Sequence, residues 1–432
     1  MKIRIISTGD KSFRRKFAAI RERGAQTSSA VEDGARAIVA DVRKRGDRAL
    51  TELTQKYDGV ALRAKELRVA DADIDAAAAA LDSGARSALT IAADRIRVFH
   101  RHQVEKSWSF RDPEGFKLGQ QITPLRRVGI YVPGGHASYP SSVLMTAVPA
   151  RVAGVDEIIM LSPAGADGYN PAVLAAARIA GVDAVYRIGG AQAVAAAAYG
   201  TQSVPKVDKI VGPGNAWVQA AKKLVYGDVD IDGIAGPSEV LVVADDSARA
   251  AYVAADLLAQ AEHGSGDECA LLLTPSARLA AAVADEIERQ LAEMPRRKAI
   301  GAVLARRGAL VVTRDLDEAV AIAEEVAPEH LELQLRKPAA VAKRLRNAGA
   351  IFLGPYAPAP LGDYLAGPNH VLPTGGTARF FSPLGVYDYV KRTSVVSATR
   401  AGLRTLAPSI AALATLEGYD AHAAAVRRRF KD

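Results

Sequence analysis

The stretch Val128-Gly-Ile-Tyr-Val-Pro-Gly-Gly135 sets the fold that we expect for the whole chain. Its first five residues are apolar or small and have the length of a buried β-strand. Pro133 and two glycines then end the strand, and Ser138-Tyr-Pro-Ser-Ser142 opens a helical pattern. A short apolar strand, a glycine turn and a helix in this order are typical of a parallel α/β sheet.

The same unit recurs at short intervals downstream. We expect strands at 157–161, 184–188 and 209–211, each followed by a helix. Asn170 followed by Pro171 is a typical helix start, with Asn170 as the N-cap. Four strand–helix units between about residues 128 and 238 predict one parallel α/β domain with helices on both faces.

A second α/β set follows, and helical spacing also precedes the first strand. Strands are expected at 240–243, 270–273, 309–312 and 350–352, and helices between them and at 30–57 and 73–99. We therefore predict two α/β domains, one inserted into the other. The first is assigned to residues 24–128 and 239–381, and the inserted one to 129–238. A basic segment, 1–23, and a basic helical tail, 382–432, flank them.

The bulk composition excludes several classes of protein. The chain has 432 residues, 49% apolar and 24% charged, as in a globular protein of two or three domains. The net charge is +8, but the basic residues are dispersed, so we expect no nucleic-acid partner. A single cysteine, Cys269, excludes a disulfide within the chain and fits the cytoplasm. Without a long apolar segment we expect neither a signal peptide nor a membrane span.

Three features suggest chemistry. Gln260 and His263 are three residues apart on an expected helix and could form half of a metal site. Glu329 and His330 are adjacent and could act as an acid/base pair. By spacing alone, the first pair more often lies on the surface or supports a metal ligand without binding the metal. The second pair is more often a surface turn. Cys269 is interpreted as structural.

The third feature is a set of glycine turns after strands, at 133–135, 189–190 and 212–214. Glycine lets a ligand approach the backbone closely, and a following helix N-terminus favours phosphate. None of the turns completes a dinucleotide fingerprint. Each turn alone is more often a plain connection between a strand and a helix. With three such turns in one sheet, a nucleotide site becomes as probable as three plain turns. Tyr131, Gln192 and Asn215 stand beside them.

Nine motifs in collinear order, from about residue 30 to the end, resemble the histidinol dehydrogenase family. They are Tyr131-Val-Pro-Gly-Gly, Ser141-Ser-Val-Leu-Met, Gly189-Gly-Ala-Gln-Ala, Gly212-Pro-Gly-Asn-Ala, Ile234-Ala-Gly-Pro-Ser-Glu-Val-Leu, Ala259-Gln-Ala-Glu-His, Pro328-Glu-His-Leu-Glu, Gly362-Asp-Tyr-x-x-Gly-x-Asn-His-Val-Leu-Pro-Thr and Glu417-Gly-Tyr-Asp-Ala-His. The approach to His422 differs from the family pattern as we expect it, because Tyr419 and Asp420 replace more aliphatic residues.

The resemblance implies the residues of a site. One Zn²⁺ per subunit would be bound by Gln260, His263, Asp363 and His422, and NAD by Tyr131, Gln192 and Asn215. Glu329 and His330 would be the catalytic acid/base pair. L-histidinol, the implied substrate, would be contacted by the four metal ligands together with Ser238, His330, His370 and Glu417.

The resemblance also implies the architecture and the reaction. The fold would be two incomplete Rossmann-like domains similar to those of aldehyde dehydrogenases, with N- and C-terminal segments that form a homodimer. Glu417 and His422 would then complete the partner's active site. The reaction would be two NAD-linked oxidations at one site, from L-histidinol through L-histidinal to L-histidine, the last steps of histidine biosynthesis. It needs no cysteine nucleophile.

Three other functions are weighed against this one. A metal-dependent hydrolase would use similar ligands and a Glu-His pair but has no need for three glycine turns. A nucleic-acid-binding protein is suggested only by the isoelectric point near 9.4, and would show a steep salt dependence. A non-catalytic scaffold predicts that Glu329→Gln, His330→Gln and Asp363→Asn have no effect.

Overall fold

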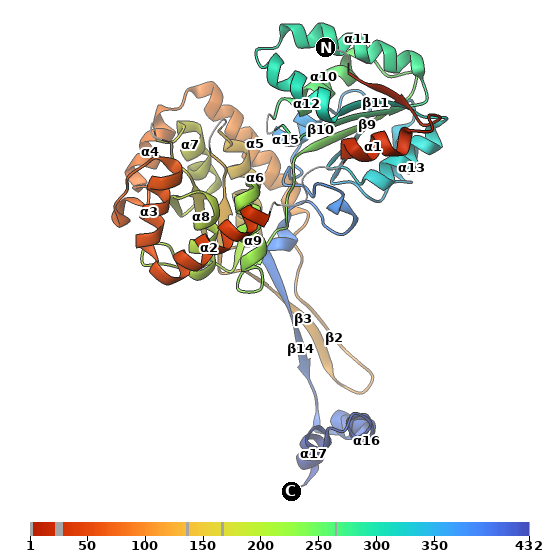
Figure 1. Cartoon of the computed structure of the whole chain (residues 1–432). Coiled ribbons are helices and arrows are strands. Elements are labelled where there is room, and N and C mark those ends of the chain that lie inside the picture. Colours follow the sequence, from red (N-terminus) through yellow and green to blue (C-terminus); the bar gives the residue numbers. More distant parts are fainter. Residues whose placement is uncertain (1–2, 22–28, 135–137, 166–167, 264–265, 432) are drawn as a thin grey trace.

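Two α/β bodies, each built on a parallel sheet, carry a tail that projects away from both (Figure 1). The computed structural model describes residues 3–21, 29–134, 138–165, 168–263 and 266–431; Gly135 of the opening stretch lies outside them. The predicted α/β class is confirmed, and one body is inserted into the chain of the other.

The six-stranded body has the strand order β1-β11-β10-β9-β12-β13, and all neighbouring strands are parallel. Successive residues of a strand point to opposite faces. Val240 and Val242 therefore pack against one layer of helices, and Leu241 and Val243 against the other. The strands are β1 (Ile5–Ser7), β9 (Glu239–Ala244), β10 (Cys269–Thr274), β11 (Gly308–Val312), β12 (His330–Gln334) and β13 (Ala350–Leu353). The first layer of helices comprises α10 (Ala250–Ala261), α11 (Ala277–Glu293) and α12 (Arg297–Arg307), and the second α1 (Phe13–Arg21), α13 (Leu316–Val326) and α14 (Pro338–Ala342). The short helix α15 (Ala359–Tyr364) follows β13.

The five-stranded body has the order β6-β5-β4-β7-β8, again parallel throughout. Its strands are β4 (Arg127–Tyr131), β5 (Glu157–Ser162), β6 (Ala184–Arg187), β7 (Lys209–Val211) and β8 (Asp230–Ile231). One face is covered by α2 (Ser29–Arg45), α3 (Asp47–Asp58), α8 (Gly190–Tyr199) and α9 (Ala216–Val225). The other is covered by α4 (Asp71–Ala80), α5 (Ser83–Arg101), α6 (Pro140–Ala153) and α7 (Pro171–Ala180). Asn170 caps α7 by accepting a hydrogen bond from the amide of Ala172, as predicted.

The structure corrects the expected domain boundaries. The helices at 29–101 were expected beside residues 239–381, but their apolar faces belong to the two cores of the five-stranded body, where they pack on α6 to α9. Residues 5–7 of the basic N-terminal segment instead form β1, which pairs with β11 in the six-stranded sheet. The physical reason is that helical periodicity predicts that a face is buried but not which sheet buries it.

The tail begins as an antiparallel ribbon. The strands β2 (Trp108–Arg111), β3 (Lys117–Pro124) and β14 (Val390–Ser397) form it in the order β14-β3-β2, and α16 (Arg400–Leu416) and α17 (Asp420–Arg427) follow. The ribbon was not predicted. Short 3₁₀ helices lie at Ala64–Glu66, Thr377–Arg379, Val386–Tyr389 and Arg428–Phe430. Within the described parts of the chain, no helix has both the length and the apolar character needed to cross a membrane.

Candidate active site

The expected cofactor residues line a single cavity at the carboxyl edge of the five-stranded sheet. Tyr131 ends β4, Gln192 lies in the first turn of α8, and Asn215 caps α9. All three line a cavity of about 490 Å³. β5 and β6 lie on one side of β4 and β7 and β8 on the other, so the strand order changes direction between β4 and β7. Such a switch point is where open α/β sheets bind ligands.

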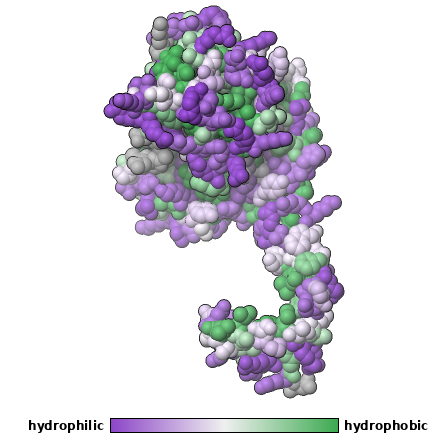
Figure 2. Space-filling view, turned by 90° about the vertical axis from the view of Figure 1, so that its right-hand side faces the viewer, coloured by the Kyte–Doolittle hydropathy of each residue, from purple (hydrophilic) through white to green (hydrophobic). Residues whose placement is uncertain are grey.

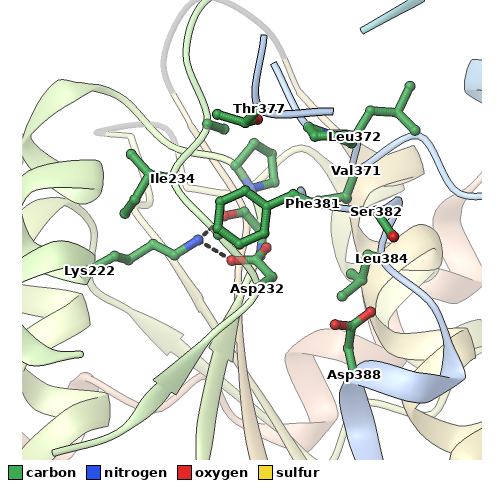
Figure 3. Close-up of a pocket in the computed structure, with 15 residues that line it drawn as sticks. Lys222, Asp232, Ile234, Val371, Leu372, Thr377, Phe381, Ser382, Leu384 and Asp388 are labelled. Carbon is green, nitrogen blue, oxygen red and sulfur yellow. Dashed lines mark hydrogen bonds and ion pairs between the residues drawn. The ribbon is translucent and has the colours of Figure 1, made fainter. Parts of the chain in front are cut away.

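The glycine turn before α9 is held rigidly. Gly212 has φ +112°, and a side chain there would collide with the carbonyl oxygen of Tyr131. The Gly212 amide donates to Oδ2 of Asp232 at 2.7 Å, and its carbonyl accepts from Nζ of Lys222 at 3.1 Å. Lys222 and Asp232 also form a buried ion pair, visible in Figure 3. Hydrogen bonds to Asp232 and Lys222 therefore fix the Gly212 amide and carbonyl. They thereby also help to position the start of α9, which Asn215 caps.

The expected metal ligands Gln260, His263 and Asp363 line a second cavity, of about 740 Å³. Gln260 and His263 lie at the end of α10, and Asp363 lies in α15. The cavity also receives residues of α5 and of the start of α6, so both bodies form it. Clefts between domains are common ligand sites.

The donor atoms in this cavity fit a zinc ion. Nδ1 of His263 is 3.2 Å from the carbonyl oxygen of Gln260, which leaves Nε2 as the atom for a metal. In the described part of the chain, the buried Nε2 of Gln260 has no hydrogen-bond partner. The atom of this amide that could bind a metal is its oxygen, Oε1. Among the described residues no three His, Cys, Asp or Glu side chains gather as a metal site. A site here therefore needs the amide of Gln260 and a ligand from elsewhere.

Glu329 and His330 are buried at the amino end of β12, beside Asp363. Oε2 of Glu329 accepts hydrogen bonds from Ser238 Oγ at 2.5 Å and from the Glu239 amide at 2.8 Å. Nδ1 of His330 lies 3.1 Å from the Glu239 carbonyl oxygen, and its Nε2 lies 3.4 Å from Oδ1 of Asp363. The expected surface turn is thus excluded for this pair.

The environment of the pair changes its protonation. Burial raises the pKa of the Glu329 carboxyl, and the neighbouring His330 opposes that rise. Burial alone would lower the pKa of His330, but the charges of Glu329 and Asp363 raise it to about 8. The pKa of His330 therefore lies near neutral pH, which suits a residue that exchanges protons in catalysis.

The approach to this pair contains a strained residue. Ala327 is buried and has φ +50°, the only positive φ of a non-glycine residue in the described ranges. It ends α13 and is followed directly by Pro328 and Glu329. Such a conformation costs roughly 1–2 kcal/mol for an L-residue. Strain of this kind is concentrated at functional sites.

His370 lies next to the same cavity. Its Nδ1 donates to the carbonyl oxygen of Asp363 at 2.9 Å, and its Nε2 lies 3.4 Å from Ser142 Oγ in α6. Asn369 donates to the carbonyl oxygen of Met145, also in α6, at 2.6 Å. The segment that follows α15 and carries Asn369 and His370 is therefore attached to the other body.

The remaining expected residues, Glu417 and His422, are not brought to the site by their own chain. They lie at the end of α16 and in α17, at the far end of the tail (Figure 1). Gln260, His263 and Asp363 lie in the bodies instead. One chain thus gathers three of the four expected metal ligands.

Comparison with known proteins decides the family. Residues 21–430 match the family described as histidinol dehydrogenase. The chain belongs to the histidinol dehydrogenase family. It is 52% identical to a histidinol dehydrogenase of Syntrophotalea carbinolica and 50% identical to one of Aquifex aeolicus, in both cases over 100% of each chain. The crystal structure of histidinol dehydrogenase from Elizabethkingia anophelis superposes with a TM-score of 0.92 and 34% identity, covering 99% of this chain and 98% of that one.

Membership in the histidinol dehydrogenase family makes the chain an oxidoreductase. The metal-dependent hydrolase and the non-catalytic scaffold are therefore set aside. Cys269 is buried at the start of β10, and its Sγ lies 3.5 Å from the carbonyl oxygen of Arg307.

Sequence reasoning missed several residues that the structure places in the candidate site. Ser138, Tyr139 and Ser141 line the larger cavity, and their place after the first glycine turn was a signal that could have found them. Glu239 holds both Glu329 and His330 through its backbone. No spacing in the sequence connects it with them, because they are neighbours only through the β9–β12 pairing.

Proposed function

We propose that the chain catalyses the zinc-dependent, NAD-linked four-electron oxidation of L-histidinol to L-histidine through L-histidinal. One observation carries this proposal. In a chain of the histidinol dehydrogenase family, Gln260, His263 and Asp363 line the same cavity. The buried Glu329–His330 pair adjoins Asp363. The reaction consumes one histidinol, two NAD⁺ and one water and yields one histidine, two NADH and three protons.

The protein's own groups would move the protons. When bound, zinc would hold the imidazole and amine of the substrate, and NAD would accept a hydride in each oxidation. His330 accepts the hydroxyl proton in the first oxidation. Glu329, held by Ser238 and the Glu239 amide, then removes a proton from the water that attacks the aldehyde. Both roles need the buried, hydrogen-bonded geometry that the pair has.

Zinc and substrate would be held by the same group of side chains. The proposed metal ligands are Gln260, His263, Asp363 and His422. A set of nitrogen and oxygen donors without thiolates suits zinc, and it leaves room for a substrate to join the metal. Further substrate contacts are assigned to Ser238, His330, His370 and Glu417. Tyr131, Gln192 and Asn215, which share the smaller cavity, are assigned to NAD.

We propose a homodimer in which each tail reaches the partner's site. Every residue of β2 is exposed, as is most of β14. A ribbon without a covering layer is only marginally stable alone. Hydrophobic surface is exposed along the tail in Figure 2, and Leu416 is 84% exposed. A partner subunit would cover this surface and receive Glu417 and His422. The lone cysteine supports a cytoplasmic location.

The direct test counts NADH per L-histidinol consumed, using zinc-loaded and chelator-stripped protein. We expect two NADH per substrate, loss of turnover on stripping, and recovery with zinc. Glu329→Gln should give one NADH, with aldehyde detectable by a carbonyl-trapping reagent. One NADH from the wild type, or full turnover without metal, would contradict the proposal.

A further inference from the structure

Asp58 lies in the smaller cavity with no role in the scheme above. It is the last residue of α3 and lines the cavity together with Tyr131, Gln192 and Asn215. Gly59 follows it with φ +71°, which ends the helix and fixes where the carboxylate is placed. The helix therefore delivers one acidic side chain to a cavity that is otherwise lined by apolar and neutral polar residues.

The Asp58 carboxylate is unsatisfied. Its Oδ2 is shielded from solvent and accepts no hydrogen bond in the described part of the chain. Burial raises the pKa of Asp58 to about 6, and no cation among the described residues lowers it. The group is still ionised near pH 8. Its position is also unfavourable, because a helix C-terminus carries partial negative charge and disfavours an anion.

A buried acceptor without a donor costs stability unless a ligand supplies the donor. The ligand proposed for this cavity carries donors of the right kind, because each ribose of NAD has vicinal hydroxyls. A carboxylate that accepts from ribose hydroxyls is a recurrent means of binding dinucleotides. In NADP the adenosine 2′-hydroxyl is replaced by a phosphate, which would repel the carboxylate.

The described residues that line the cavity carry no positive charge to compensate such a phosphate. None of the described residues that line it is lysine, arginine or histidine. Sites that accept a 2′-phosphate commonly place an arginine beside it. The carboxylate of Asp58 and the lack of a cation among the described lining residues therefore both disfavour binding of NADP.

We propose, on the basis of the NAD site proposed above, that Asp58 accepts a hydrogen bond from the adenosine 2′-hydroxyl of NAD and thereby excludes NADP. Asp58 is then both a cofactor contact and the residue that determines cofactor specificity.

The test is calorimetric titration of the zinc-loaded protein at pH 8, without substrate, with NAD and NADP. The variants are Asp58→Asn and, as a matched control, Glu52→Gln, which removes a charge from an exposed side chain of the same helix. A hydrogen bond to a charged group is typically about 1.5–3 kcal/mol, so Asp58→Asn should weaken NAD binding about 10- to 100-fold. NADP binding should stay equal or improve. The control should leave both unchanged.

Thermal unfolding of the ligand-free protein separates this role from a structural one. Asp58→Asn should unfold at the same or a higher temperature, because an unpaired buried charge is removed. If Asp58→Asn weakens the binding of NAD and NADP equally, the carboxylate contacts a group that both nucleotides share. If the affinity for NAD is unchanged, the carboxylate does not contact NAD. Either result overturns the proposal. If the wild type binds neither nucleotide, the NAD assignment itself fails.

Discussion

At the scale of single residues, the cofactor cavity depends on glycines whose backbone no other residue adopts easily. Gly212 combines φ +112° with close approach to the Tyr131 carbonyl. Gly227 has a similar φ, +105°, but open space around its α-carbon. Replacing Gly227 by alanine therefore measures the energetic cost of the backbone conformation alone. Replacing Gly212 adds the cost of the steric contact with Tyr131.

We expect Gly227→Ala to lower the free energy of unfolding by about 1–3 kcal/mol, the cost of a left-handed residue alone. Gly212→Ala should lower it further and weaken NAD binding, because the turn that carries Asn215 must move. Urea unfolding and NAD titration of both variants measure this. Equal losses of stability, with NAD binding intact in Gly212→Ala, would contradict the role of the turn.

The sequence revealed single residues only where they stood next to a recognisable turn or within a motif. Tyr131, Gln192 and Asn215 follow strands, and the structure places them in one cavity. Asp58 belongs to the same cavity but lies on a helix more than seventy residues upstream of Tyr131. Nothing in its local sequence distinguishes it from a solvated acid, so only the packed structure could reveal it.

At the scale of elements, a buried polar network joins the three segments that carry the proposed chemistry. Gln334 in β12 donates to Asp256 in α10 at 2.6 Å. Glu332, also in β12, accepts from the amide of Ala359 at the start of α15 at 2.8 Å. Burial and the adjacent Glu332 carboxylate raise the pKa of Asp256 to about 9. We predicted no strand at 330–334, because His330, Glu332 and Gln334 interrupt its apolar pattern. Glu332 and Gln334 are nevertheless the residues that join the elements.

The network predicts a pH dependence of stability. The pKa of Asp256 is higher in the folded protein than the unfolded value of about 3.9. Its contribution to stability is therefore full below about pH 4 and is lost as the pH rises towards 9. Asp256→Asn keeps a hydrogen-bond donor without a charge, so its stability relative to wild type should increase with pH, by at most ~1.4 kcal/mol per pH unit.

Urea unfolding of wild type and Asp256→Asn between pH 5 and 8.5 measures this difference. Asp71→Asn, at an exposed side chain on α4, is the control and should show no trend. A difference that stays constant over this pH range would show that Asp256 is already ionised in the folded protein and would contradict the prediction.

At the scale of the whole molecule, local patterns predicted two α/β bodies and the insertion of one into the other. They did not predict which helices belong to which sheet, because the apolar stripe of α2 or α5 suits either surface. The exposed ribbon was also missed, since its strands are rich in polar residues and β14 lies more than 250 residues after β3, with which it pairs. Glu417 and His422 were expected at the site, and their position on the projecting tail is why the proposed site requires a second chain.

The central claim is that one active site is built from the bodies of one subunit and the tail of another, and mixed dimers test it most directly. Asp363→Asn impairs only the body and His422→Ala only the tail, so each homodimer should be inactive with L-histidinol and NAD. After the two variants are unfolded together and refolded, half of the dimers are mixed and each has one intact site. We predict recovery of about a quarter of the activity of wild type treated in the same way. A mixture as inactive as its parents, although mixed dimers are present by mass spectrometry, would contradict the account.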